Sequence, residues 1–163
     1  MTDWTGTPPV ILAGDIPTGD DWDLILDELT ALSDDWAVWV PVWSTSGTAP
    51  SVGDGTLTGR YKQIGKTVHY NMTLTWGTTT SAGTGTWSFT TPIDVQTARL
   101  PLPTMAIDVS AALGYPCVAR TTTASPNILA IYTSTPAVIA GSTVPFVWAN
   151  TDQLIINGTY EAE

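Results

Sequence analysis

Few side chains in this sequence have the types and spacing that catalysis or metal binding requires. His69 is the only histidine and Cys117 the only cysteine, so no pair of imidazoles or thiolates is available to bind a metal ion. His69 occupies a polar position of an alternating segment, and no nucleophile-elbow pattern accompanies it, which argues against a Ser-His-Asp triad. Cys117, between Pro116 and Val118, is expected to be a small buried apolar residue.

A small hydrolase is the enzymatic alternative, because two carboxylates facing each other in a cleft suffice for glycoside hydrolysis. Asp94, Asp108 and Asp152 are its candidate residues. The Gly-rich run at 77–86 lacks the Lys and the following helix of a phosphate loop, and is expected to be a flexible loop. The acids of residues 20–23 lack the spaced oxygens and central Gly of a calcium loop. We therefore expect a protein that is not an enzyme and binds no metal or cofactor.

Eight tryptophans raise the alternative of a carbohydrate platform, since an indole face can stack on a sugar ring. Five of them fall in expected strands, where burial in a core is the expected outcome. These are Trp39, Trp43, Trp76, Trp87 and Trp148.

The composition favours all-β structure. Only 12% of the 163 residues are charged, roughly half the usual share, and Thr is abundant beside 14 Gly and 12 Pro. The net charge of −10 arises largely from residues 1–35, which carry nine acids and no Lys or Arg. Such a field does not attract nucleic acid or an anionic membrane. No secretory signal or apolar stretch of membrane-spanning length is visible, so we expect synthesis and folding in a cytoplasm.

The N-terminal region predicts an extended arm at 1–17 and a short helix at 18–35. Prolines prevent a helix in the arm, whose apolar residues need a surface to lie against. These candidate docking residues are Trp4, Val10, Ile11 and Leu12. Thr18 or Asp20 can cap the helix, and apolar residues spaced 3, 4, 3 and 4 apart form a coiled-coil-like seam. The seam consists of Trp22, Ile25, Leu29, Leu32 and Trp36.

This seam is too short to hold a coiled coil together unaided, because short isolated helices are only marginally stable. Either the domain or other copies of the helix must cover it, and we favour other copies.

Residues 36–163 predict a jelly-roll-like antiparallel β-sandwich of about nine strands. Residues 66–76 alternate, with apolar side chains expected inward and His69 among the outward polar ones. Further strands are expected at 36–43, 105–111 and 144–149. Three segments, at 36–43, 127–133 and 153–157, have no consistently polar face. Self-association would cover their outer faces, and a threefold axis suits a sandwich standing on an axial helix.

Residues 50–92 (PSVGDGTLTGRYKQIGKTVHYNMTLTWGTTTSAGTGTWSFTTP) resemble the distal knob domains of fibre proteins of phages that infect actinobacteria. The similarity lies in the Arg60-Tyr61 strand end, the turn at residues 64–66 and the short strand ending at Pro92. Residues 145–161 resemble the last two strands of such domains, and residues 11–32 resemble the segment that precedes them. The chain departs from tail fibres in having no long shaft.

This resemblance implies a trimeric head-fibre, capsid decoration or minor tail protein on the virion surface. Its partners would be two further copies of the chain and the major capsid protein or another virion protein. A receptor-binding tail-fibre tip that recognises a host cell-wall glycan through loops 77–86 or 121–126 is the alternative.

Overall fold

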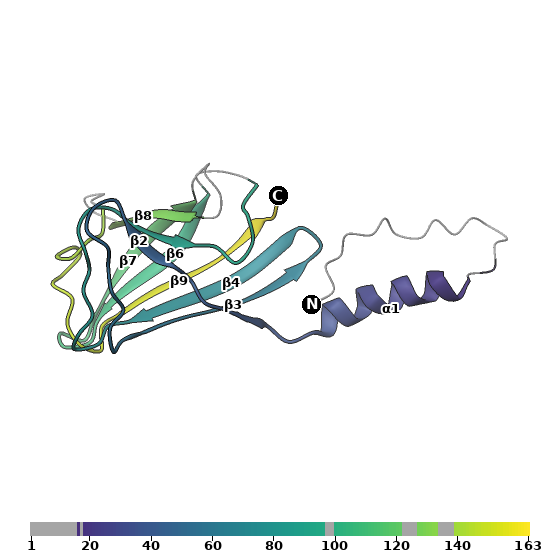
Figure 1. Ribbon diagram of the computed structural model, residues 1–163, viewed down its shortest axis with the longest axis horizontal. Coiled ribbons are helices and arrows are strands. Elements are labelled where there is room, and N and C mark those ends of the chain that lie inside the picture. Colours follow the sequence, from purple (N-terminus) through teal and green to yellow (C-terminus); the bar gives the residue numbers. More distant parts are fainter. Residues whose placement is uncertain (1–15, 17, 97–99, 122–126, 134–138) are drawn as a thin grey trace.

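The computed structural model describes residues 16, 18–96, 100–121, 127–133 and 139–163. A single helix precedes a β-structured body in this part of the chain, and Figure 1 shows the helix projecting from one end of that body. The elements are α1 (Gly19–Ser33), β1 (Ala37–Trp39), β2 (Trp43–Thr45), β3 (Thr56–Ile64), β4 (Thr67–Thr75), β5 (Trp87–Thr90), β6 (Pro101–Asp108), β7 (Leu113–Thr121), β8 (Asn127–Thr133) and β9 (Gln153–Glu161).

Helix α1 begins at a capping box. The Thr18 hydroxyl accepts a hydrogen bond from the Asp21 N–H at 3.3 Å, and the Thr18 N–H donates to the Asp21 carboxylate at 2.8 Å. Two N–H groups that lack helical partners are thereby satisfied, which confirms the prediction of Thr18 as a cap. The helix ends at Ser33, so the predicted end at 35 is wrong, and Trp36 lies beyond the helix rather than on its seam.

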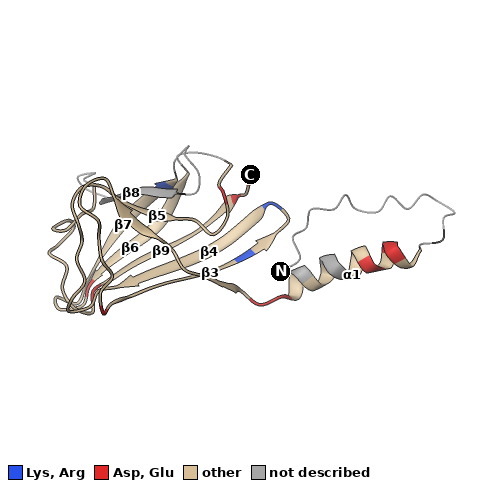
Figure 2. Ribbon diagram, viewed as in Figure 1, with Lys and Arg blue, Asp and Glu red and all other residues tan. Residues whose placement is uncertain are grey.

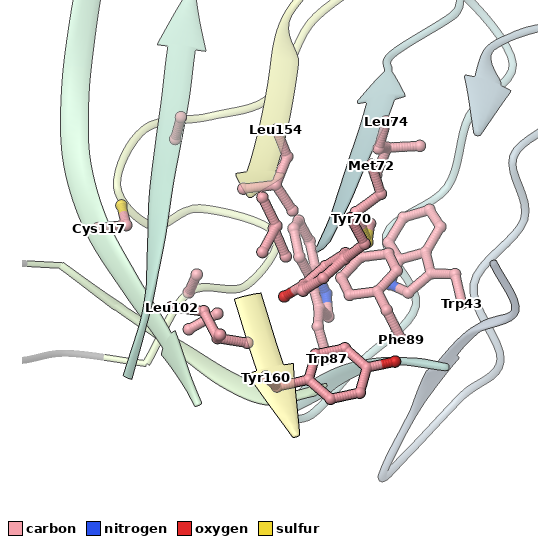
Figure 3. Close-up of a cluster of buried hydrophobic side chains, with 14 of the residues drawn as sticks. Trp43, Tyr70, Met72, Leu74, Trp87, Phe89, Leu102, Cys117, Leu154 and Tyr160 are labelled. Carbon is pink, nitrogen blue, oxygen red and sulfur yellow. The ribbon is translucent and has the colours of Figure 1, made fainter. Parts of the chain in front are cut away.

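The strands form an antiparallel sandwich, which confirms the predicted fold class. Those of the described chain are hydrogen-bonded in the order β1-β3-β4-β9-β6-β7-β8-β5-β2. The sheet folds over, so that β2 and β5 lie across the core from β4 (Figures 1 and 3). The β3–β4 turn is the predicted one, with Gly65 at a φ of 58°.

The core lies between the two layers and is rich in aromatic rings (Figure 3). The predicted alternation of β4 is confirmed, because Val68, Tyr70, Met72 and Leu74 are all buried. Trp43 meets Trp87 with ring centroids 5.1 Å apart and an interplanar angle of 80°. Such edge-to-face pairs add to the stabilisation that burial of the rings provides.

Three strand predictions are corrected by the structure. Segment 36–43 is split, because β1 pairs with β3 at one edge of the sheet while β2 pairs with β5 at the other. Pro41 lies at this crossing, where a residue without an N–H loses no ladder hydrogen bond. Residues 145–149 form no strand, since Phe146 and Trp148 instead pack on the core from a loop. The strand expected at 105–111 is β6, which begins four residues earlier.

Two buried tyrosines differ in how their hydroxyls are satisfied. The Tyr160 hydroxyl donates to the Ile93 carbonyl at 2.7 Å and accepts from the Ile93 N–H at 3.2 Å. The Tyr70 hydroxyl is buried without a hydrogen-bond partner among the described residues.

Replacing Tyr160 by Phe should therefore cost about 1–3 kcal/mol of unfolding free energy, because the Ile93 backbone is left unpaired. Tyr70→Phe should be neutral or stabilising in the same urea titration at pH 7, and an equal loss in both variants would contradict this account.

The same two hydroxyls predict a loss of stability at high pH. Burial raises the pKa of Tyr160 to about 12 and raises the pKa of Tyr70 further. Tyrosines in the unfolded chain ionise near pH 10, so their contribution is fully present below that pH. It falls as the pH rises towards 12, because the unfolded chain releases protons that the folded chain retains. Urea titrations at pH 8, 10 and 11 should show a smaller loss of unfolding free energy with rising pH for Tyr70→Phe than for the wild type. An equal loss in the two proteins would contradict this account.

Candidate interaction surfaces

Asp152, one of the three hydrolase candidates, is a structural residue. Its side chain is 1% exposed, and its two carboxylate oxygens accept hydrogen bonds from the N–H groups of Val109 (2.9 Å) and Ala149 (2.7 Å). Its backbone carbonyl accepts from the Trp76 N–H at 2.8 Å. This carboxylate therefore joins three chain segments at the end of the sandwich far from α1, and it does not face a cleft.

The other acids at this end also hold loops. The exposed Asp54 accepts hydrogen bonds from Thr78 and Thr79, and the half-buried Asp108 accepts from the Ser110 hydroxyl and the Ala111 N–H. These hydrogen bonds lower the pKa of both carboxyls because they favour the charged form.

Loop 77–86 is not the flexible loop that the sequence suggested. Ser51 and Ser81 exchange two backbone hydrogen bonds of 2.9 and 2.8 Å, and Gly47 donates to the Thr84 carbonyl at 3.0 Å. Backbone pairing with residues 46–55 therefore anchors it along its length.

We expect Asp152→Asn to reduce the free energy of unfolding by about 1.5–3 kcal/mol, because an amide cannot accept from both N–H groups. Asp108→Asn is the matched control, and its loss should be much smaller because a single oxygen of that carboxylate accepts both hydrogen bonds and the amide oxygen of Asn can replace it. Thermal and urea unfolding of both variants measures the difference. A stable Asp152→Asn protein would show that this carboxylate does not hold the loops.

The remaining polar candidates do not form a reactive cluster. The His69 imidazole Nδ1 lies 2.9 Å from the Thr159 hydroxyl on the outer face of the sheet. Cys117 is buried, as predicted, and burial raises the pKa of its thiol. No group of three or more His, Cys, Asp or Glu side chains is placed to hold a metal ion in the part of the chain that the structure describes.

The tryptophans proposed as a carbohydrate platform belong to the core. Trp43, Trp76, Trp87 and Trp148 are each less than 10% exposed, and Trp39 packs against this cluster. The expected burial is therefore confirmed for Trp43, Trp76, Trp87 and Trp148, whereas Trp39 is half-buried. Two other tryptophans, Trp22 and Trp36, are 53% and 41% exposed.

The apolar stripe of α1 is exposed along the helix. The exposed fractions of Trp22, Leu29 and Leu32 are 53%, 56% and 53%, and Ile25 is half-buried. No described residue of α1 belongs to the sandwich core or packs against it. Four of the five predicted seam residues thus lie on one projecting helix, and the fifth, Trp36, lies on the sandwich.

Two cations on β3 hold the junction between helix and sandwich. The Lys62 ammonium donates to the carbonyls of Leu32 and Asp34, each at 2.7 Å. The Arg60 guanidinium donates to the Trp36 carbonyl at 3.5 Å. Helix α1 has no basic residue in its last turn, so Lys62 supplies the positive charge that its C-terminal end favours (Figure 2).

The outer face of the sandwich also carries exposed apolar side chains. Val38, Val40 and Val42 are 76%, 72% and 60% exposed. On the outer face of β6 and β7, Met105 and Val118 are exposed, and the half-buried Ile155 of β9 lies opposite Met105. These residues fit the prediction that segments 36–43 and 153–157 lack a wholly polar outer face.

Some predicted residues cannot be placed. The side chains of segment 127–133, the candidate docking residues Trp4, Val10, Ile11 and Leu12, and loop residues 122–126 lie outside the described part of the structure.

No protein-family model, curated protein or solved structure has a significant match to the chain. No helix among the described residues has the length and apolar character needed to cross a bilayer.

Proposed function

We propose that this chain is a non-enzymatic structural protein of a phage virion, a homotrimeric surface decoration or head-fibre protein that docks on the capsid through its N-terminal arm. The observation that carries the proposal is the exposed apolar stripe on α1. A stripe of this kind is unfavourable in water, and the sandwich of its own chain does not cover it.

Self-association supplies the missing cover. Full burial of a Leu or Ile side chain contributes about 1.5–3 kcal/mol, so packing four stripe residues from each copy is a substantial driving force. It also stabilises α1 itself, because most of the stability of a short protein helix comes from packing its apolar face. The 3-4-3 spacing of Trp22, Ile25, Leu29 and Leu32 is the spacing at which parallel helices interlock.

The direction of α1 suits a parallel trimer. The helix leaves one end of the sandwich, and its N-terminus points away from that end (Figure 1). A threefold axis along three such helices places the three sandwiches together and the three N-terminal arms at the opposite end. Three linked arms bind a surface far more tightly than one, because the second and third contacts become intramolecular.

The location on a virion is supported by the resemblance at residues 50–92 and 145–161 to phage fibre knobs. Without a shaft between arm and sandwich, the knob would sit close to the particle, which favours a capsid decoration or head-fibre role over a tail fibre.

Leu29→Asp should dissociate the trimer, because a charge within the seam would be buried at high cost. Thr30→Asp is the matched control: it places the same charge one residue along α1, outside the 3-4-3 stripe, and should leave the trimer intact. Native mass spectrometry of both variants at the same concentration tests this. Dissociation of both, or of neither, would contradict a seam formed by this face.

Capsid docking is tested separately with a chain that lacks residues 1–17 but keeps the Thr18 cap. This variant should remain trimeric and fail to bind purified particles of the encoding phage from which the protein has been removed. The full chain should bind such particles and ignore host cells. Equal binding by both forms would show that the arm is not the docking segment.

A further inference from the structure

An open depression of about 510 Å³ lies on the outer face of the sandwich, across β4, β9 and β6. It is lined by Trp36, His69, Asn71, Pro103, Asn157 and Thr159, together with Tyr70 of β4 and Gly158 of β9. Neither the core nor the α1 stripe includes this depression.

The sheet register explains how these side chains come together. In the β4–β9 ladder, Asn71 lies opposite Asn157 and His69 lies opposite Thr159, so the four side chains form two adjacent pairs on one face. Trp36 precedes β1, which is separated from β4 by β3, so the large indole must extend over β3 to line the same depression. The backbone carbonyl of Trp36 is held by Arg60.

The chemistry of the lining is neutral and rich in hydrogen-bonding groups. Two carboxamides can each donate and accept hydrogen bonds, and the side chains of Asn71 and Asn157 bond to no other described residue. Both are exposed to solvent. No Asp, Glu, Lys or Arg is among the residues that line the depression. The nearest cations, Arg60 and Lys62, lie opposite Asn71 and His69 on β3, and their side chains bind backbone carbonyls at the junction with α1.

We propose that this depression is a binding site for a neutral saccharide. A pyranose ring has an apolar C–H face that packs on an indole and a rim of hydroxyls that both donate and accept. Trp36 provides the apolar platform, and Asn71, Asn157 and the His69–Thr159 pair provide the matching polar rim. The open shape suits a segment of a longer glycan, which enters from the side.

This site differs in place and in chemistry from those that the sequence suggested. Four of the five candidate platform tryptophans are buried, and the half-buried Trp39 packs against the core. Loop 77–86 lies at the opposite end of the sandwich from α1 (Figure 1). The proposal does not depend on capsid docking or on the trimer.

The test begins with a glycan array carrying neutral and charged saccharides, probed with the full chain. The soluble form of the best-bound neutral saccharide is then titrated by calorimetry, so that each binding event is monovalent. Trp36→Ala and Asn157→Ala should each weaken binding at least tenfold. The matched controls are Trp22→Ala, which removes another exposed tryptophan side chain, from α1, and Asn150→Ala, which removes an exposed amide from a distal loop. Both should bind the saccharide as the wild type does.

Several results would overturn the proposal. One is the absence of binding to any neutral saccharide on the array, and another is neutral binding that survives both Trp36→Ala and Asn157→Ala. A third is that no saccharide binds while Trp36→Ala lowers the mass of the assembly. That result would mean that a neighbouring copy of the chain, and not a saccharide, occupies the depression. Because Trp22→Ala alters the trimer seam and leaves the depression intact, failure of the saccharide site and failure of the trimer are distinguishable.

Discussion

The proposed assembly depends on apolar surface that the sandwich cannot bury. The inward faces of β4, β5 and β9 are already filled by aromatic and aliphatic side chains, and the core has no contact with α1 among the described residues. Among the described residues, Lys62 of the sandwich holds the helix at its C-terminal end, where it binds the carbonyls of Leu32 and of the C-cap residue Asp34. Its exposed leucines and tryptophan must therefore find cover other than the sandwich or remain in water, at a free-energy cost that grows with their exposed area.

The two ends of the sandwich serve different purposes. At the end far from α1, carboxylates and hydroxyls hydrogen-bond to backbone groups and fix the loops, with Asp152 buried at their centre. At the end near α1, Arg60 and Lys62 fix the junction with the helix. The polar groups of this chain thus mainly position backbone. The depression beside Trp36 is the exception, because its amides are exposed and unengaged within the described part of the molecule.

The sequence predicted those features that depend on local periodicity or on caps. The alternation of residues 66–76 identified the buried face of β4, and Thr18, one of the two candidate caps, identified the start of α1. Periodicity could not show that residues 36–43 cross between opposite edges of the sheet, since both halves of that segment remain apolar and extended. It also could not distinguish a strand at 144–149 from a loop whose Phe146 and Trp148 fill the core.

The candidate sites were less predictable because they arise from register. Lys62 binds the end of α1 only because β3 places it beside a helix that ends some thirty residues earlier in the chain. Trp36 was assigned to the helix seam by spacing alone, whereas the helix ends at Ser33 and Trp36 lines the depression on the sheet. Asn71 and Asn157 are far apart in sequence, and only the β4–β9 pairing brings them together.

The central claim is that copies of the chain cover the stripe of α1. Sedimentation equilibrium of the full wild-type chain over a range of micromolar concentrations measures this most directly. The account predicts a single species with three times the 17.3 kDa mass of one chain. A mass of 17.3 kDa that stays constant at every concentration would contradict it.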